Sequence, residues 1–388
     1  MLSIGIDIGG TNTKILVVDL DSYITKQIII KTPYFSNEVN SNILNYKKLL
    51  DFITSLLNKH SFNKIDKITI SGQMHSTVIL NNSNIEYGPL TWQTENFKNQ
   101  TLLKSIKSRN KQNDIKRGYP IFNLENKVVG TYGTILTKLF GDLTGNYNLI
   151  HLSEAAGTGF YNLDKNNWDF ELLKELNFST LMMPKVISNL KFYKHKTFNT
   201  KISIPIGDFQ MSMATNLSNR SNAISINIAT GGQICIINKN KKPLFQTRPS
   251  LFRSIKYDCY TQLPAGRLIN LLEKKNGKKR IIFNKKIYNT VKSCPELFTY
   301  SEMNNFIDCQ LINTSHESIF HSILKKYVNL LYKYESYYQF DEIKLSGSIL
   351  INYPFFSEGI TYFFPEKKII TTDNDVMKKH EKLLLSII

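Results

Sequence analysis

Residues 5–14 combine an acid, glycines and hydroxyls in a pattern that suits phosphate chemistry. Two glycines here separate two alternating apolar runs. Backbone N–H groups in such a turn can face an anion, and a threonine hydroxyl adds a donor. Asp7, at the end of the first run, can hold Mg²⁺ through water because Mg²⁺ keeps much of its hydration. We expect phosphate contacts from Gly9, Gly10, Thr11, Asn12 and Lys14; an ordinary hairpin with an Asp-flanked turn is the alternative.

Residues 228–233 form a second turn of small residues between two strand patterns. Thr230, Gly231 and Gly232 provide the same groups as the first turn and predict a second phosphate cradle. The two turns occupy corresponding places in two α/β halves of the chain. A nucleotide clamped between two related domains requires this arrangement.

Asp208 directly follows a strand pattern and begins a helical one, within residues 205–210. A helix N-terminus favours an ionised carboxylate. An ionised Asp can accept the proton of a hydroxyl that attacks phosphorus, which is the general-base role in phosphoryl transfer. An Asp at such a position is, taken alone, more often a helix N-cap.

Polar and aromatic side chains that suit a polyol follow the next strand pattern. They are Gln73, Met74 and His75 in residues 71–76, with Trp92 and Gln93 downstream. An amide, an imidazole and an indole offer hydrogen bonds and an apolar face. A satisfied loop histidine and a core tryptophan are the alternatives for His75 and Trp92.

The elements that must position these residues alternate between strand and helix. Residues 1–7 and 13–19 read as a hairpin, 46–60 as an amphipathic helix, and 67–70 as a strand. We expect a helix at 101–115 and a loop-rich section over 130–159, where glycines are frequent.

The second half repeats this alternation. We expect strands at 201–206, 223–228 and 233–237, with a helix at 209–216. Thr314 and Glu317 have capping-box spacing before a long amphipathic helix. A strand at 342–345 then leads to the turn Ser346-Gly347-Ser348, which opens another helix.

Length and composition limit the alternatives. A chain of 388 residues with 41 % hydrophobic residues predicts two globular domains. The net charge of +18 comes from lysines dispersed among Asn and Ile, so we expect no specific nucleic-acid surface. Four cysteines without a CxxC pair suggest neither a zinc site nor a disulfide framework. No apolar run approaches the ~20 residues of a membrane span, and we expect a cytoplasmic protein.

Taken together, these motifs resemble those of the FGGY carbohydrate kinases, in the sugar kinase, Hsp70 and actin superfamily. Residues 5–9 resemble the first phosphate motif, 72–75 the sugar-contacting GQMH, and Trp92-Gln93 the aromatic sugar segment. Gly207-Asp208 stands where the family has its catalytic Asp, and residues 229–231 where it has GTS. Gly347, Ser348 and Asn352 lie near its adenosine motif.

The resemblance implies an α/β fold of two ribonuclease H-like (actin-like ATPase) domains with an interdomain cleft. Residues 1–204 are expected to bind the sugar and 205–388 the nucleotide. The implied activity is Mg²⁺- and ATP-dependent phosphorylation of a sugar by a monomer or homodimer, with Asp208 as the base and also in contact with the sugar.

Within the family, residues 207–210, 223–233 and 246–249 are most similar to sedoheptulokinase. Thr94 and Asn96 stand where the family has Asp-x-Arg, so xylulose, an alditol or another heptose remains an alternative substrate, and an inactive binding protein an alternative function. Gly10 replaces the usual Thr and gives a sequence that also resembles ROK-type glucokinases, whose cysteine-rich zinc motif is absent.

Overall fold

The computed structural model describes residues 1–35, 43–91, 129–217, 222–229, 231–239, 242–251, 255–277, 280–290, 315–372, 380–381 and 384. The chain divides into two compact units. Unit 1 comprises Met1–Thr215, Arg248–Ile255 and Asp375–Ile388, and unit 2 comprises Asn216–Thr247 and Lys256–Asn374. The predicted division into residues 1–204 and 205–388 stays a prediction. The first compact unit continues to Thr215.

Unit 1 is built on a seven-stranded sheet with the order β13-β14-β4-β1-β2-β3, and β15 also pairs with β4. Its strands are β1 (Leu2–Ile8), β2 (Asn12–Asp19), β3 (Thr25–Lys31), β4 (Ile65–Gly72), β13 (Phe192–Lys194), β14 (Lys201–Ser203) and β15 (Ile206–Gly207). The antiparallel β1–β2 pair confirms the predicted hairpin. Both β1 and β15 run parallel to β4.

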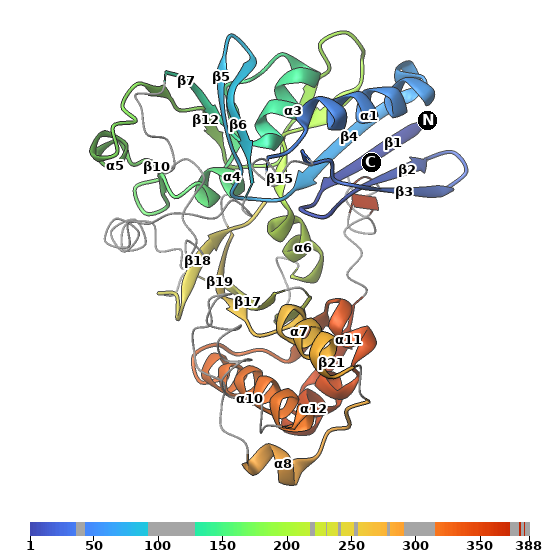
Figure 1. Cartoon of the computed structure of the whole chain (residues 1–388), viewed down its shortest axis with the longest axis vertical. Coiled ribbons are helices and arrows are strands. Elements are labelled where there is room, and N and C mark those ends of the chain that lie inside the picture. The colour runs from blue at the N-terminus through green and yellow to red at the C-terminus, as the bar shows by residue number, and fades with distance from the viewer. Residues whose placement is uncertain are drawn as a thin grey trace. The chain divides into compact units, whose positions relative to one another are not determined.

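The alternation of β1 separates a core face from a polar face. Ile4, Ile6 and Ile8 are fully buried in one cluster with side chains of α1 (Tyr46–Lys59) and α3 (Ile135–Thr144). Figure 1 shows both helices beside β4. Successive side chains of a strand point to opposite faces, so Gly5 and Asp7 lie on the other face. The predicted helix at 46–60 and strand at 67–70 are confirmed.

The prediction of a loop-rich section over residues 130–159 is wrong. It contains α3, β8 (Leu149–His151) and α4 (Leu152–Gly157), and β7 (Gly130–Gly133) joins a four-stranded sheet. Gly141 lies inside α3 because the Tyr147 ring occupies the space of a side chain: a Cβ there would lie 2.1 Å from Tyr147 Cδ1. These glycines allow close packing.

Several short elements complete unit 1. The four-stranded sheet has the order β11-β7-β5-β6, and two smaller pairs are β10-β9 and β12-β8. Their bounds are β5 (Thr77–Asn81), β6 (Asn84–Leu90), β9 (Tyr161–Asn162), β10 (Asn167–Trp168), α5 (Phe170–Glu175), β11 (Leu181–Met182), β12 (Lys185–Ile187) and α6 (Asp208–Asn216). The predicted strand 201–206 is divided into β14 and β15.

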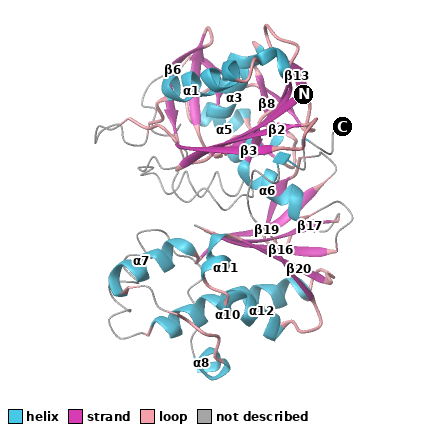
Figure 2. Cartoon of the chain, turned by 90° about the vertical axis from the view of Figure 1, so that its right-hand side faces the viewer, coloured by secondary structure: helices cyan, strands magenta, loops and turns pink. Residues whose placement is uncertain are grey.

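Unit 2 is built on a six-stranded sheet with the order β18-β19-β17-β16-β20-β21, whose edge strand β18 ends in Arg248 and Pro249, two residues assigned to unit 1. The strands are β16 (Ala223–Ile228), β17 (Gly232–Asn238), β18 (Gln246–Pro249), β19 (Lys256–Leu263), β20 (Glu342–Ser346) and β21 (Lys368–Thr371). Helices α7 (Gly266–Asn276), α10 (His316–Glu335), α11 (Ser348–Asn352) and α12 (Phe355–Phe363) lie on one side of this sheet, with α8 (Lys285–Thr290) beyond (Figure 2). Buried side chains from the sheet and these helices form one core.

Most predicted elements of the second half are confirmed: β16, β17, β20, and α11 after Gly347. The predicted capping box is wrong. Ser315 is the N-cap of α10, because it is extended (φ −65°, ψ 150°) and its side chain accepts a hydrogen bond from the Ser318 N–H at 3.1 Å. Thr314 lies outside the described residues.

Two features concern the remaining sequence expectations. Cys235 and Cys259 are directly opposite each other on β17 and β19, as buried free thiols. Among the helices of the described residues, none is long and apolar enough to cross a membrane. The helix predicted at 101–115, together with Trp92, Gln93, Thr94 and Asn96, lies outside the described residues, as do Cys294 and Cys309.

Candidate active site

Three adjacent parallel strands of unit 1 end at the same edge of the sheet. Asp7 is paired with Ser71, and Gly207 with Gly72, so β1, β4 and β15 are in register here. Asp208 follows β15 directly. Ligands in open α/β sheets commonly bind beyond the carboxyl ends of parallel strands. The sequence therefore brings two carboxylates and the loop after β4 to one edge.

Asp7 is buried, and the hydroxyl of the neighbouring strand holds its carboxylate. It is 6 % exposed, and the Ser71 hydroxyl donates a hydrogen bond to its Oδ1 at 2.6 Å. Lys14 is its cross-strand partner in the hairpin. Within the described residues no three His, Cys, Asp or Glu side chains form a metal-binding group. A single carboxylate fits Mg²⁺, which usually takes one or two protein carboxylates besides water and phosphate oxygens.

The first glycine turn is closed by its own backbone. The Gly9 N–H donates to the Asn12 carbonyl at 3.0 Å, and the Thr32 hydroxyl donates to the Gly9 carbonyl at 2.7 Å. A Cβ on Gly9 would lie 2.7 Å from the Asn12 oxygen. Gly9 therefore shapes the turn, while Thr11 and Asn12 are exposed at its tip.

Asp208 is partly buried at the first residue of α6. Burial raises its pKa to about 7, the charge of Asp7 adds to the rise, and a 2.7 Å hydrogen bond from the Phe209 N–H opposes it. The sequence led us to expect a carboxylate stabilised by the helix N-terminus. Burial and the neighbouring charge outweigh that effect. A base with a pKa near neutral suits proton transfer at physiological pH.

Helix α4 supports β15, the strand that ends directly before Asp208. The Ser153 hydroxyl accepts a hydrogen bond from the Gly207 N–H at 3.0 Å. The next residue, Glu154, is 2 % exposed. Burial raises the pKa of Glu154 to about 8, the Thr134 hydroxyl opposes the rise, and the charge of Asp208 adds to it. Sequence reasoning missed Glu154, because nothing in its local pattern marks it.

The loop after β4 is held against α4. His75 has a left-handed backbone (φ 62°), and its Nδ1–H donates to the Gly157 carbonyl at 2.7 Å. Burial, then the charge of Arg248, lowers the pKa of His75 to about 4, so the ring is neutral. Positive φ in a non-glycine residue stores strain and is concentrated at functional sites.

The other two residues of the predicted sugar motif differ in their surroundings. Met74 is buried, and its side chain occupies the space that a Cβ on Gly157 or Gly207 would need. Its packing thus links the loop to the strand before Asp208. The Gln73 side-chain amide donates to the Tyr34 hydroxyl at 3.4 Å.

Arg248 belongs to the same unit and is 3 % exposed. Its guanidinium carbon lies 4.8 Å from the centre of the Phe209 ring, next to Asp208 in sequence. Sequence reasoning noticed this residue only through the resemblance of residues 246–249, and gave it no role in the site.

The second glycine turn is surrounded by two helix starts of unit 2. The Gly266 N–H, at the start of α7, donates to the Ala229 carbonyl at 2.8 Å. Gly347 has φ 122°, and a Cβ there would lie 2.1 Å from the Ile228 oxygen. Gly231 is exposed, whereas Gly232 is buried against Tyr327. Sequence reasoning found Gly347 but missed Gly266.

The remaining predicted nucleotide residues are only partly described. Ser348 and Asn352 are exposed at the two ends of α11. Thr230 lies outside the described residues. The contacts of these residues with a nucleotide stay predictions.

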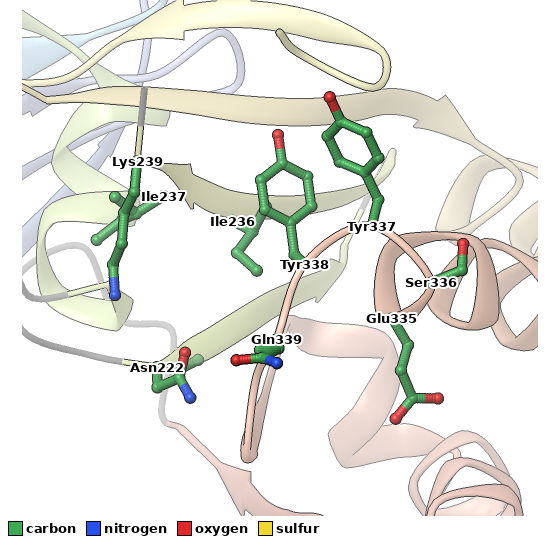
Figure 3. A pocket seen from close by; sticks show the side chains of 10 residues that line it. Asn222, Ile236, Ile237, Lys239, Glu335, Ser336, Tyr337, Tyr338 and Gln339 are labelled. Carbon is green, nitrogen blue, oxygen red and sulfur yellow. The ribbon is translucent and has the colours of Figure 1, made fainter. Parts of the chain in front are cut away.

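A cavity of about 520 Å³ in unit 2 lies at the other end of the β16–β17 hairpin (Figure 3). It is lined by Asn222, Ala223, Ile236, Ile237, Lys239, Glu335, Ser336, Tyr337, Tyr338 and Gln339. Ile224 pairs with Ile236 at that end, whereas Ile228 pairs with Gly232 at the turn. The cavity is therefore separate from the predicted phosphate cradle.

A sequence model of the N-terminal domain of the FGGY family of carbohydrate kinases matches residues 2–204. Xylulose kinase of Staphylococcus xylosus is 27 % identical over 208 residues, which are 48 % of this chain and 42 % of that protein. The match thus spans less than half the length of that relative.

Two solved structures are similar over the whole chain. Gluconate kinase from Lactobacillus acidophilus has a TM-score of 0.73 at 18 % identity, covering 100 % of this chain and 90 % of that one. Plasmodium falciparum glycerol kinase, solved with ADP, has a TM-score of 0.72 at 14 % identity with the same coverage. They show that this chain has the two-domain actin-like ATPase fold, which confirms the predicted α/β fold class.

Proposed function

We propose, since the chain belongs to the FGGY family of carbohydrate kinases, that it transfers the γ-phosphate of ATP to a sugar hydroxyl. One observation carries the proposal. The strands β1 and β15 both pair with β4, so their register brings Asp7 near the end of β1, Asp208 directly after β15 and the Gln73–His75 loop after β4 to one edge of unit 1. The site thus combines a carboxylate for a cation, a base, and polar groups for a polyol.

In this proposal Asp208 acts as the general base. Its carboxylate accepts the proton of a sugar hydroxyl as the hydroxyl oxygen forms a bond to the γ-phosphorus of ATP. The bond between that phosphorus and the oxygen bridging it to the β-phosphate breaks, and ADP leaves. Asp7 would hold Mg²⁺, which supplies charge neutralisation for the phosphates. The neutral His75 and the Gln73 amide orient the sugar.

The most specific substrate we propose is sedoheptulose, phosphorylated on a primary hydroxyl to sedoheptulose 7-phosphate. The support is the similarity of residues 207–210, 223–233 and 246–249 to sedoheptulokinase. The last segment contributes the buried Arg248 to unit 1. Relatives named xylulose kinase and gluconate kinase make another polyol or sugar acid the alternative.

A coupled assay of ADP release tests the proposal. Mg²⁺-ATP is supplied with C5 to C7 ketoses, aldoses, alditols and sugar acids, and we expect turnover to be highest with sedoheptulose. Release with none of these compounds, in a protein that still binds ATP, would favour the inactive binding protein instead. Higher turnover with another sugar would leave the kinase activity and overturn the substrate.

The Asp208→Asn variant tests the base. A positioned base contributes about 10²- to 10⁴-fold in rate, so kcat should fall within that range. Asn keeps the size of Asp and can accept the Phe209 N–H bond, so folding and ATP affinity should change little. Equal turnover in Asp208→Asn and wild type would assign the proton transfer to another acid.

A further inference from the structure

His380, far along the sequence, is buried on the polar face of unit 1. It is 0 % exposed. Its Nε2 lies 2.9 Å from the Ser71 hydroxyl and its Nδ1 lies 2.8 Å from the Thr69 hydroxyl. Both hydroxyls are on β4, and Ser71 is the residue that donates to Asp7. Neither the family match nor the motifs of the sequence include His380.

The hydrogen-bond directions follow from Asp7. Because the Ser71 hydroxyl donates its proton to the Asp7 carboxylate, its oxygen must accept from His380, so Nε2 carries the hydrogen. Nδ1 of the neutral ring is then an acceptor, and the Thr69 hydroxyl donates to it. The three hydrogen bonds thus run in one direction, from Thr69 through His380 and Ser71 to Asp7. Burial lowers the pKa of His380 to about 3, which agrees with a neutral ring.

Gly5 makes room for this histidine. A Cβ on Gly5 would lie 2.6 Å from His380 Cβ and 2.7 Å from His380 Cγ, with no other residue among its three nearest atoms. Gly5 lies on the Asp7 face of β1, two residues before Asp7. Leu384, four residues after His380, is buried against Leu16 and Val18. Among the described residues of the C-terminal stretch, His380 is thus held by hydrogen bonds to β4 and Leu384 by apolar contacts.

We propose that His380 is a positioning residue for Asp7, which it holds in place through Ser71. His380 fixes the Ser71 hydroxyl, and this hydroxyl binds one oxygen of the Asp7 carboxylate. The series of hydrogen bonds therefore fixes the rotation of that carboxylate. A carboxylate that orients the water shell of Mg²⁺ gains from such support, because partners of metal-binding groups set their orientation. The inference rests on the proposed function in assigning Mg²⁺ to Asp7.

Calorimetric binding of ADP with and without Mg²⁺ is the main test, since it needs no sugar and no turnover. In His380→Ala we expect the gain in ADP affinity from Mg²⁺ to fall by about 10-fold, as is typical when a partner of a metal ligand is lost. Metal-free ADP affinity should stay unchanged. In the activity assay the Mg²⁺ concentration for half-maximal rate should rise while the KM for the sugar stays constant.

Leu384→Ala is the matched control. It weakens the seating of the same segment without removing a polar group, so the melting temperature should fall while the Mg²⁺ dependence stays near wild type. An equal fall in melting temperature for His380→Ala and Leu384→Ala, with unchanged Mg²⁺ dependence in both, would overturn the proposal.

A second pair of variants tests the same geometry independently. Gly5→Ala should displace His380 and reproduce the Mg²⁺ effect of His380→Ala. In the double variant Gly5→Ala with His380→Gly the clash is gone, so its stability should exceed that of Gly5→Ala alone while the Mg²⁺ effect persists. A Gly5→Ala protein with wild-type Mg²⁺ dependence would contradict the inference. Absence of sugar-dependent ADP release in wild type would instead contradict the proposed kinase activity. The calorimetric measurement of ADP binding would still test the role of His380.

Discussion

Burial raises the pKa values of two acids of the site region, Asp208 and Glu154, above their ordinary values. Asp208 is partly exposed, and the charge of Asp7 raises its pKa further. Glu154 is enclosed behind it on α4. Groups with raised pKa values in one site can divide acid and base roles between them, because each titrates in a different range.

The pKa of Asp208, about 7, predicts the pH profile of the reaction. The base must be ionised, so kcat/KM for the sugar should rise about tenfold per pH unit below pH 7 and level off above it. Replacing Asp7 by Asn removes the charge that adds to the rise. Carbon-13 NMR titration of the Asp208 carboxyl in the nucleotide-free protein should then show a lower midpoint. A midpoint near 4 in wild type would contradict this account.

Glu154 predicts a pH dependence of stability. Its folded pKa, about 8, lies above the ordinary value of 4.5, so the folded state binds the extra proton between these values. The contribution of protonated Glu154 to the free energy of unfolding is fully present below pH 4.5 and is lost as pH rises toward 8. Glu154→Gln, a neutral isostere, should match wild type near pH 5 and exceed it at pH 8 by on the order of 3 kcal/mol. Glu171→Gln, at an exposed position of α5, is the control and should show no such divergence in thermal unfolding.

At the scale of elements, adjacent glycines of the second turn have different roles. A Cβ on Gly232 would lie 1.7 Å from the Tyr327 hydroxyl oxygen and 2.8 Å from Leu263 Cβ, whereas nothing lies within 4 Å of a Cβ on Gly231. Tyr327 lies on α10 and is fully buried, and its hydroxyl donates a hydrogen bond to the Pro264 carbonyl at 3.2 Å. The helix and the turn are therefore packed directly together.

This difference predicts opposite outcomes for two neighbouring substitutions. Gly232→Ala should destabilise the protein by about 1–3 kcal/mol through overpacking. Gly231→Ala should change stability by less than about 0.5 kcal/mol and instead weaken ADP binding, because the added methyl projects into the open side of the turn. Denaturant unfolding and calorimetry separate the two effects. Strong destabilisation by Gly231→Ala would mean that the turn is packed differently.

Local patterns account for the elements that were predicted correctly. Alternation in β1 and helical spacing in α1 are properties of a few consecutive residues, and each states which face is buried. The glycines of α3 and α4 misled the prediction because Gly141 and Gly157 are required by Tyr147 and Met74, contacts that local sequence does not show. The cap of α10 differed by one residue for a local reason, since two hydroxyl residues stand side by side there.

The site was predictable only as far as its motifs are contiguous. Asp7, the Gln73–His75 loop and Asp208 each lie in a recognisable segment, and strand register brings them to one edge. Gly266 and Glu154 act through contacts with other segments. His380 is 309 residues from Ser71, its partner, so no pattern within either segment predicts the contact.

At the scale of the whole molecule, unit 1 is assembled from three separate stretches of chain. The family match ends at residue 204, yet the unit also contains Arg248–Ile255 and Asp375–Ile388. Leu251 from the second stretch is buried with Ile206 and Met211 beside α6. The third stretch brings His380 and Leu384. The strands that carry Asp7 and Ser71 therefore depend on residues encoded after nearly all of unit 2.

A chain ending at residue 374 tests this dependence. Its unit 1 would lose the buried Leu384, worth on the order of 2 kcal/mol, and would expose the Thr69 and Ser71 hydroxyls that now bind His380. Amide hydrogen exchange should become faster in β1, β2 and β4, while β16 and β20 of unit 2 keep their protection. The Leu384→Ala variant should give a smaller change in the same strands, since it keeps the polar contact. Unchanged exchange in β1 and β4 of the shortened chain would show that the C-terminal stretch adds nothing to the stability of the strands that hold Asp7 and Ser71.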